Sequence, residues 1–265
     1  MRDLAAFSSD TAPSLVPFQR APSRPKQGPT HFPVKSSAEP AVTTHDIAKV
    51  ERTEMYLKSV LVIALGGHRV TTSRVAEAMG VSAPSASEML KRLEHLGYVE
   101  PSPDGVQLTG TGVQIATQVV RRLRLAERLL TDILKMDLDR VYDEACKMEH
   151  VISPEVESRL DDVLKHPETC PHGHPIPGPD GAFLPEDGQT LATLTARTPA
   201  RVTALPEERT DLLKAALATG LHVGMELSVE ATATPRGPII VRLGDRHRTI
   251  PREAAEQIRV RPLSR

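Results

Sequence analysis

The stretch that decides the fold is Gly80-Val-Ser-Ala-Pro-Ser-Ala-Ser-Glu-Met-Leu-Lys-Arg-Leu-Glu-His-Leu-Gly97. Ser82 suits the N-cap of a helix and Pro84 suits its first turn, so a helix is predicted from here to the second glycine. A shorter helix is predicted from about Thr72 up to Gly80. Two short helices joined by a tight turn that contains glycine are typical of a helix-turn-helix.

A β-hairpin is predicted directly after the second of these helices. Tyr98-Val-Glu100 and Val106-Gln-Leu108 are short runs of β-prone residues, and Asp104-Gly105 between them is typical of a hairpin tip. A hairpin in this place is the wing of a winged helix-turn-helix. The second helix of such a module can place its N-terminal residues against base edges in the major groove of DNA, while the wing contacts phosphate.

The leading face of the second helix carries small side chains that would let its backbone approach DNA closely. Glu88 offers an acceptor for the amino group of a cytosine, although an exposed glutamate is more often an ordinary solvated charge. The predicted DNA-binding residues are Ser82, Ala83, Pro84, Ser85, Ser87, Glu88, Lys91 and Arg92. The candidates for phosphate contact, which only their grouping supports, are Lys58, Arg69, Arg74, Lys91 and Arg92.

Longer helices are predicted on both sides of this module. Upstream, residues 45–65 carry apolar side chains at helical spacing, and Gly66-Gly67 supplies the stop. Downstream, a helix from about Gly112 to Leu134 has an apolar face wider than the module needs. Such a face favours pairing with a second copy of itself or with a following helical hairpin, here residues 139–149 and 153–165. A symmetric dimer would suit a palindromic operator.

A candidate metal site lies in Tyr142-Asp-Glu-Ala-Cys-Lys-Met-Glu-His-Val151. On a helix, Cys146, Glu149 and His150 stand at i, i+3 and i+4, so a thiolate, a carboxylate and an imidazole leave from one face. These are three ligands of a site whose remaining ligands must come from elsewhere in the fold. The alternative is a buried cysteine with polar neighbours at the surface.

Composition limits the classes of protein to consider. The 265 residues are enough for two or three small domains. A net charge of -1 with 3% aromatic residues gives no basic signature over the whole chain, so any DNA-binding face must be local. The two cysteines, Cys146 and Cys170, do not resemble a secreted disulfide framework. No apolar run could span a bilayer and the N-terminus lacks a signal-peptide pattern, which predicts a cytoplasmic protein with no membrane partner.

Changes in composition divide the rest of the chain. Residues 1–43 are proline-rich and should form a disordered tail. The alternative for this segment is an arm that contacts phosphate through Arg20, Arg24, Lys26 and Lys35. Residues 179–200 are rich in Gly, Pro and Thr and predict a linker. Short strands with glycine and proline turns over residues 201–265 predict a small β-barrel.

Five motifs resemble the diphtheria-toxin-repressor family of metal-dependent regulators, which includes iron-dependent regulators and manganese transport regulators. They are Thr53-Glu-Met-Tyr-Leu57, Val81-Ser-Ala-Pro-Ser85, Arg124-Leu-Ala-Glu-Arg-Leu-Leu130, Glu144-Ala-Cys-Lys-Met-Glu-His-Val-Ile-Ser153 and His166-Pro-Glu-Thr-Cys-Pro-His-Gly-His-Pro-Ile-Pro-Gly178. The resemblance covers about residues 44–180. It implies a mainly α fold, with a winged helix-turn-helix domain at 44–118 and a helical metal-binding and dimerisation domain at 119–178. An SH3-like β-barrel domain would follow at 201–265.

The resemblance also implies a function. The expected protein is a homodimeric repressor that binds operator DNA and controls genes for the uptake and homeostasis of manganese or iron. Mn2+ or Fe2+ would be the corepressor, and Co2+, Ni2+ and Zn2+ should bind in vitro because the affinity order favours later metals. Metal would tether the first helix to the dimerisation domain and so set the two DNA-reading helices at operator spacing. No enzymatic activity is expected.

Site residues carry over from the family to this chain position by position. The primary metal site is implied to combine Met55 with Cys146, Glu149 and His150. For a second, ancillary site, Glu127 matches a ligand position, and Glu208-Arg-Thr-Asp211 resembles a family Glu-x-x-Gln. The alternative for Glu208 and Asp211 is an acidic helix start at the surface.

The ancillary site is also where this chain departs from the family. Leu123 and Tyr142 stand where the iron regulators carry histidine, so the sequence leaves open whether a second site exists. Cys170-Pro-His172-Gly-His174 superficially resembles a zinc knuckle. Its prolines and single cysteine fit a rigid connecting loop better.

Two other functions stay open at this point. A winged-helix regulator that senses redox state through Cys146 would bind DNA independently of metal. A metallohydrolase would use Cys146, Glu149 and His150 around a catalytic zinc. The sequence shows neither a recognisable nucleophile or base arrangement nor an α/β pattern, which argues against the hydrolase.

Overall fold

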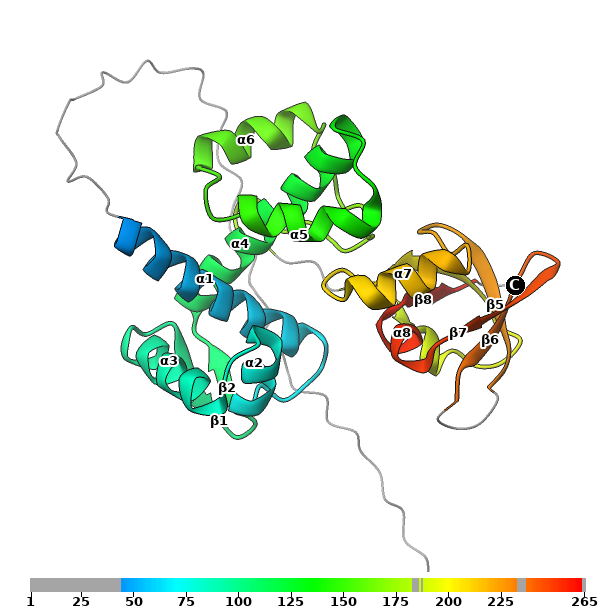
Figure 1. Ribbon diagram of the computed structural model, residues 1–265, viewed down its shortest axis with the longest axis horizontal. Helices are drawn as coiled ribbons and strands as arrows, with labels where there is room; N and C mark the ends of the chain where they lie inside the picture. Colours follow the sequence, from blue (N-terminus) through cyan, green and yellow to red (C-terminus); the bar gives the residue numbers. More distant parts are fainter. Residues whose placement is uncertain (1–43, 183–185, 187, 233–236, 264–265) are drawn as a thin grey trace, which may run out of the picture. The chain divides into compact units, whose positions relative to one another are not determined.

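The computed structural model describes residues 44–182, 186, 188–232 and 237–263 (Figure 1). The predicted tail over residues 1–43, with its alternative as a phosphate-binding arm, lies outside the described residues. Within these ranges, no helix combines the length and the apolar character that crossing a bilayer requires.

The first part of the chain is a winged helix-turn-helix. Its elements are α1 (Thr44–Leu65), α2 (Thr72–Met79), α3 (Ala83–His95), β1 (Val99–Ser102) and β2 (Gly105–Leu108). The hydroxyl of Ser82 caps α3 by accepting a hydrogen bond from the Ser85 amide, as predicted from the sequence. β1 and β2 pair antiparallel, with Val99 opposite Leu108, so the predicted wing is confirmed.

The core of this module forms where α1, α2 and α3 pack together with the start of the next helix. The buried side chains are Tyr56, Leu57, Val60, Leu61, Val70, Val75, Ala76, Ala86, Met89, Leu90, Leu93, Val99, Ala116 and Val120. Ala116 and Val120 belong to the helix that follows the wing, so this helix is shared between the module and the next layer. Its position couples α3 to the rest of the helical region.

Three further helices follow the wing. α4 (Gly110–Arg128) continues into a π-helical turn over Leu129–Ile133, and α5 (Leu138–Met148) and α6 (Pro154–Val163) complete the set. They enclose a separate small core of Leu123, Ala126, Leu130, Val141, Ala145 and Ile152. α5 ends at Met148, one residue before Glu149, which keeps helical backbone angles as the C-cap. Glu149 and His150 therefore leave from the end of the helix rather than from its middle.

The C-terminal part is a six-stranded antiparallel sheet with two helices (Figure 1). Its elements are β3 (Gln189–Thr190), β4 (Pro199–Ala204), α7 (Thr210–Ala218), β5 (Glu226–Thr232), β6 (Ile239–Leu243), β7 (Arg246–Ile250), α8 (Arg252–Gln257) and β8 (Arg259–Pro262). The strand order is β3-β8-β4-β5-β6-β7, so the last strand lies between the first two. The predicted fold class, mainly helical with a small C-terminal β domain, is confirmed.

The stretch predicted as a linker, residues 179–200, contributes to this domain. β3 pairs with β8, and a single 3-10 turn follows at Leu191–Thr193. Leu191 and Leu194 are buried in the same core as Leu213, Val241 and Ile258. The Gly, Pro and Thr content suggested a linker. Instead, the side chains of Leu191 and Leu194 pack into the core and hold residues 188–194 against the sheet.

Candidate metal-binding sites

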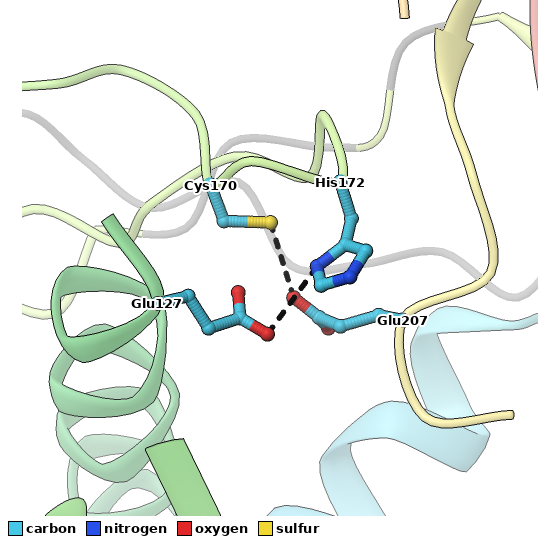
Figure 2. Close-up of side chains that lie close together, drawn as sticks. All are labelled: Glu127, Cys170, His172 and Glu207. Carbon is cyan, nitrogen blue, oxygen red and sulfur yellow. Dashed lines mark hydrogen bonds and ion pairs between the residues drawn. The ribbon is translucent and has the colours of Figure 1, made fainter. Parts of the chain in front are cut away.

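Four buried side chains with metal-ligand chemistry meet at one point: Glu127, Cys170, His172 and Glu207. One ligand atom from each lies within 4.8 Å of those of the other three. Figure 2 shows them converging from α4, from the loop after α6 and from the segment between β4 and α7. The sequence positions span eighty residues, so only the tertiary fold assembles this group, which we call the buried cluster.

Three arginines on one face of α4 hold the loop that brings in two of these ligands. Arg121 donates to the Pro177 carbonyl at 2.7 Å, Arg124 to Pro175 at 2.5 Å and Arg128 to Thr169 at 2.6 Å. The spacing 121, 124, 128 places all three guanidinium groups along one helical stripe. The loop is therefore fixed through its backbone carbonyls, which leaves the side chains of Cys170 and His172 available.

The turn inside the loop depends on Gly173. The Cys170 amide donates to the His174 carbonyl at 2.8 Å, and the Gly173 amide donates to the Cys170 carbonyl at 2.9 Å. Gly173 has φ +96°, and a Cβ there would overlap the carbonyl oxygen of Thr203. From the sequence alone, a rigid loop and a metal-binding segment are alternatives. The structure allows both, because the tight turn places Cys170 and His172 beside Glu127.

Gly173→Ala should therefore destabilise the protein by about 2 kcal/mol or more, through backbone strain plus the steric overlap with Thr203. Urea unfolding measures the loss. Gly220→Ala is the matched control, because Gly220 has φ +90° with nothing within 4 Å of an added Cβ. An equal loss in both variants would show that the close approach at Thr203 is unimportant.

Arg124 compensates one carboxylate of the buried cluster. Its guanidinium forms two 2.9 Å hydrogen bonds to Glu207, with both side chains buried. Burial disfavours the ionised form of Glu207, but the charge of Arg124 outweighs it and the pKa of Glu207 lies well below its ordinary value. Glu207 also accepts from the Cys170 thiol at 3.2 Å. Glu207 is therefore an ionised ligand candidate at neutral pH.

The side chains of the other two members of the cluster, Glu127 and His172, form no hydrogen bonds to the rest of the described chain. Across the part of the chain that the structure describes, neither carboxylate oxygen of Glu127 and neither ring nitrogen of His172 has a hydrogen-bond partner, although all four atoms are buried. His172 Nδ1 lies 3.3 Å from Glu127 Oε1. Burial, followed by the charge of Glu207, raises the pKa of Glu127. Buried polar atoms without partners are costly.

A divalent cation would satisfy these atoms. Two carboxylates, one imidazole and one thiol form a mixed donor set suited to Mn2+, Fe2+ or Zn2+. Burial raises the pKa of the Cys170 thiol, and coordination to a cation is what would favour its thiolate. The residues present therefore fit a metal ion.

The predicted ancillary residues divide between the cluster and the surface. Glu127 lies in the cluster. Glu208 and Asp211 are exposed and outside it, and Asp211 forms a 2.7 Å ion pair with Arg209. The glutamate that points inward is Glu207, one residue earlier than the sequence suggested. Leu123 is an apolar side chain buried in the hydrophobic core and does not belong to the cluster.

A second polar group links α1 to the end of α5. His150 Nδ1 lies 2.6 Å from Glu54 Oε2, and His150 Nε2 lies 3.3 Å from Glu149 Oε1. Lys58 Nζ lies 2.6 Å from Glu149 Oε1 and 3.9 Å from Cys146 Sγ. Met55, the fourth ligand implied by the family resemblance, is half-buried beside Glu54 in α1. We call Cys146, Glu149 and His150 with these α1 residues the helix-end group.

The helix-end group also contains buried metal-ligand atoms that form no hydrogen bond within the described ranges. Among the described residues, Glu149 Oε2 and His150 Nε2 are buried without a hydrogen-bond partner. Burial opposes the protonation of His150, but the neighbouring carboxylates of Glu149 and Glu54 outweigh it and raise its pKa to about 9. Burial raises the pKa of the Cys146 thiol to about 12. A cation that bound here would displace these protons, so the residues fit a metal whose binding is pH-dependent.

Lys58 requires a correction to the sequence interpretation. It was grouped with the candidates for phosphate contact, but it is only 4% exposed and its ammonium is paired inside the protein. Arg69 remains at the surface, where it forms a 2.9 Å ion pair with Asp104 at the tip of the wing. Lys58 lies where α1 meets the end of α5, and its ammonium pairs there with Glu149.

The candidate DNA-binding residues lie at the N-cap and along the exposed face of α3. The exposed ones are Ser82, Ala83, Pro84, Ser85, Glu88, Lys91 and Arg92, and Ser87 is partly exposed. The apolar residues Ala86, Met89, Leu90 and Leu93 occupy the opposite face of the same helix and are buried. The helix thus presents a continuous polar face that is free for a ligand.

Comparison with known families matches almost the whole described chain. Residues 48–106 match the model for the iron-dependent repressor N-terminal DNA-binding domain. Residues 109–178 match the iron-dependent repressor metal-binding and dimerisation domain. Residues 189–262 match the FeoA domain, which confirms the SH3-like prediction for the C-terminal part.

Named relatives and solved structures agree with this. The chain is 35% identical over 225 residues to the iron-dependent repressor IdeR of Mycobacterium tuberculosis, across 80% of this chain and 97% of IdeR. It is 46% identical over 132 residues to the diphtheria toxin repressor of Corynebacterium diphtheriae, across 49% of this chain and 58% of that repressor. Matches to the diphtheria toxin repressors thus span about three fifths of their length. A manganese-dependent transcriptional repressor in complex with manganese superposes with a TM-score of 0.73 at 30% identity, over 80% of this chain and all of that one.

Proposed function

Because the chain belongs to the iron-dependent repressor family, to which IdeR and the diphtheria toxin repressors belong, we propose that it is a metal-dependent transcriptional repressor. Its role is not enzymatic. It controls genes for the uptake and homeostasis of manganese or iron, with Mn2+ or Fe2+ as corepressor. The observation that carries the proposal is the buried cluster: four ligand-type side chains, two of which have no hydrogen bond to their polar atoms among the described residues, in a protein whose α3 presents an open polar face.

Two groups of residues would hold metal. In the buried cluster, the ligands are Glu127, Cys170, His172 and Glu207. In the helix-end group, they are Cys146, Glu149 and His150, with Met55 from α1 as the ligand that the family resemblance implies. A bound divalent ion supplies positive charge that neutralises the carboxylates and thiolates and favours the conformation in which they converge.

The chain's own residues explain how neutralising these carboxylates and thiolates would affect DNA binding. Glu127 lies on α4, and α4 also packs against the core of the winged module through Ala116 and Val120. Glu149 and His150 face α1 through Lys58 and Glu54. Both groups therefore stabilise one arrangement of the winged module on the helical region, and with it the placement of α3.

The donor sets allow both candidate metals. Thiolate and thioether donors are softer than carboxylates and favour Fe2+ over Mn2+ at the helix-end group. Two carboxylates and an imidazole in the buried cluster suit either ion. Co2+, Ni2+ and Zn2+ should bind in vitro because divalent affinities rise toward the later metals.

DNA and a second copy of the chain are the proposed partners. The exposed residues at the start and along one face of α3 would face base edges and phosphates in the major groove of operator DNA, namely Ser82, Ala83, Pro84, Ser85, Ser87, Glu88, Lys91 and Arg92. A homodimer would place two such helices on a palindromic operator. A regulator of this kind acts where the operator is, in the cytoplasm.

The test is a mobility shift of the full chain, stripped with a chelator, on the DNA upstream of its own gene and of nearby metal transporter genes. Titration with Mn2+ and with Fe2+ under anaerobic conditions should produce a shift that is absent without metal. A shift of equal size with and without metal would overturn the proposal. Sensing by Cys146 oxidation is not favoured, because a thiol with a pKa of about 12 is almost fully protonated and reacts slowly.

Arg92→Ala tests the DNA-reading face. Removing one exposed cation from α3 should weaken operator binding and lower the slope of log affinity against log salt by about one. Fluorescence anisotropy at several salt concentrations gives both quantities. Lys214→Ala is the control, since Lys214 is exposed on α7 near Asp139 and should leave binding and slope unchanged. The same slope in both variants would argue against α3 as the contact surface.

A further inference from the structure

Lys58 is a buried cation inside a candidate cation site. Its Nζ lies 2.6 Å from Glu149 Oε1, 3.9 Å from Cys146 Sγ and 5.8 Å from the centre of the Tyr142 ring. The side chains of Lys58 and Glu149 are 5% and 0% exposed. Lysine is almost never fully buried unless it is paired, because removing an ammonium from water is costly.

Because Lys58 pairs with one oxygen of Glu149, the two carboxylate oxygens have different surroundings. Oε1 accepts a hydrogen bond from Lys58, whereas Oε2 has no hydrogen-bond partner within the residues that the structure describes, and neither has His150 Nε2, which lies 3.3 Å from Oε1. The 2.6 Å ion pair with the buried carboxylate of Glu149 holds the side chain of Lys58 as an ammonium. A protonated ammonium has no lone pair, so Lys58 is not a metal ligand.

We propose that Lys58 is a built-in cation of the helix-end group: it ties α1 to Glu149 in the metal-free protein and opposes an incoming divalent ion, so that it sets the metal affinity of this site. The inference rests on the proposed function, which assigns Cys146, Glu149 and His150 as ligands. A divalent ion held by Glu149 Oε2 and His150 Nε2 would lie close to the ammonium of Lys58, which donates a hydrogen bond to Glu149 Oε1. Like charges at such separations repel strongly in a site shielded from water.

The proposed role predicts that removing Lys58 lowers the stability of the metal-free protein but raises its metal affinity. Without Lys58, the buried carboxylate of Glu149 loses its nearest cation, so the metal-free protein should lose stability. The same change removes the repulsion on a divalent ion, so metal should bind more tightly. A residue that only positioned Glu149 for the metal would instead lose stability and metal affinity together.

The test compares Lys58→Met with Lys49→Met, which removes an exposed lysine from the same helix. Both are made in a Cys170→Ala background, so that the absorption band of a Co2+–thiolate bond reports Cys146 alone. Co2+ and Mn2+ affinities are measured by competition with a chelator, and thermal unfolding is followed with and without metal. Lys58→Met should bind metal at least about tenfold more tightly than the background protein. Its unfolding temperature should be lower without metal and should rise more when metal is added.

Metal affinity that is unchanged or weaker in Lys58→Met would overturn the proposal. If Lys58→Met does not fold without metal, Lys58→Gln allows the same comparison, because it donates to Glu149 without a charge. Glu149→Gln separates this failure from failure of the proposed site. If the Cys170→Ala protein shows no Co2+–thiolate band, or Glu149→Gln in that background binds metal normally, the helix-end group is not a metal site: the inference about Lys58 and the ligand assignment of Cys146, Glu149 and His150 are then wrong, whereas the repressor proposal still stands on the buried cluster and its own mobility-shift test.

Discussion

Glu127→Gln should abolish metal loading of the buried cluster while leaving the protein folded. Glutamine has nearly the shape of glutamate but lacks its charge, so the substitution removes one of the two carboxylates that converge with Cys170 and His172. Loss of an outer-shell partner typically costs a metal site about 10- to 100-fold in affinity, and loss of a ligand should cost more. Because the operator-binding state is proposed to require metal, the metal-dependent mobility shift should disappear with it.

Glu208→Gln is the matched control for this prediction. Glu208 is adjacent in sequence to Glu207 and is exposed, outside the cluster. Equilibrium dialysis with Mn2+ should therefore show normal stoichiometry in Glu208→Gln and one ion fewer in Glu127→Gln. If Glu208→Gln loses the ion and Glu127→Gln keeps it, the buried cluster is not the site.

The same variant has a second readout in the metal-free protein. Burial and Glu207 raise the pKa of Glu127 above its ordinary value of 4.5. An acid whose pKa is raised on folding holds its proton longer in the folded state, so it costs stability as pH rises above the unfolded value. Chelator-treated Glu127→Gln should therefore be more stable than the unsubstituted protein at neutral pH. Their unfolding curves should converge as the pH falls toward 4.5. A variant that is less stable than the parent at neutral pH would contradict this account of Glu127.

The local elements were predictable because their signals are local. Ser82 and Pro84 mark the start of α3, and Asp104-Gly105 marks the wing, within a few residues of the structure they produce. The i, i+3, i+4 spacing of Cys146, Glu149 and His150 brings them to one end of α5 even though the helix stops at Met148. In each case the geometry follows from one short stretch of backbone.

The buried cluster was not predictable in the same way. Glu207 reaches Glu127 because Arg124 on α4 pairs with it, a contact between residues far apart in the sequence. Arg121, Arg124 and Arg128 hold the loop that carries Cys170 and His172 by its backbone carbonyls, and carbonyl partners leave no trace in the sequence. Neither helical nor strand periodicity applies between β4 and α7, so nothing indicated which of the neighbouring glutamates, 207 or 208, points inward. The Cys-Pro-His pattern was the one available signal.

Lys58 shows the same limit for a single charge. In the sequence it is one more cation among several near the DNA-reading helices. Its partner, Glu149, is 91 residues away. Only the packing of α1 against the end of α5 distinguishes a buried ion pair from a phosphate contact, and the two interpretations place the side chain on opposite faces of α1.

Arg124→Ala should cause the largest loss of stability among the substitutions considered. The guanidinium of Arg124 is buried, and it pairs with both oxygens of Glu207 at 2.9 Å. Removing one partner of a buried ion pair leaves an uncompensated charge and typically costs about 3–5 kcal/mol. Here the cost is set by Glu207, which would face the second buried carboxylate of Glu127 without its paired guanidinium.

Arg159→Ala supplies the contrast, because Arg159 and Glu155 pair at the same 2.9 Å distance but are 75% and 76% exposed. A surface pair of this kind should contribute less than about 1 kcal/mol. Urea unfolding in the presence of a chelator measures both variants, and added Mn2+ should restore part of the loss in Arg124→Ala, since a divalent ion compensates the same two carboxylates. Equal losses in the two variants would mean that burial does not govern the Arg124 pair. A loss in Arg124→Ala that Mn2+ leaves untouched would mean that the arginine acts through the loop carbonyl of Pro175 rather than through the charge of the cluster.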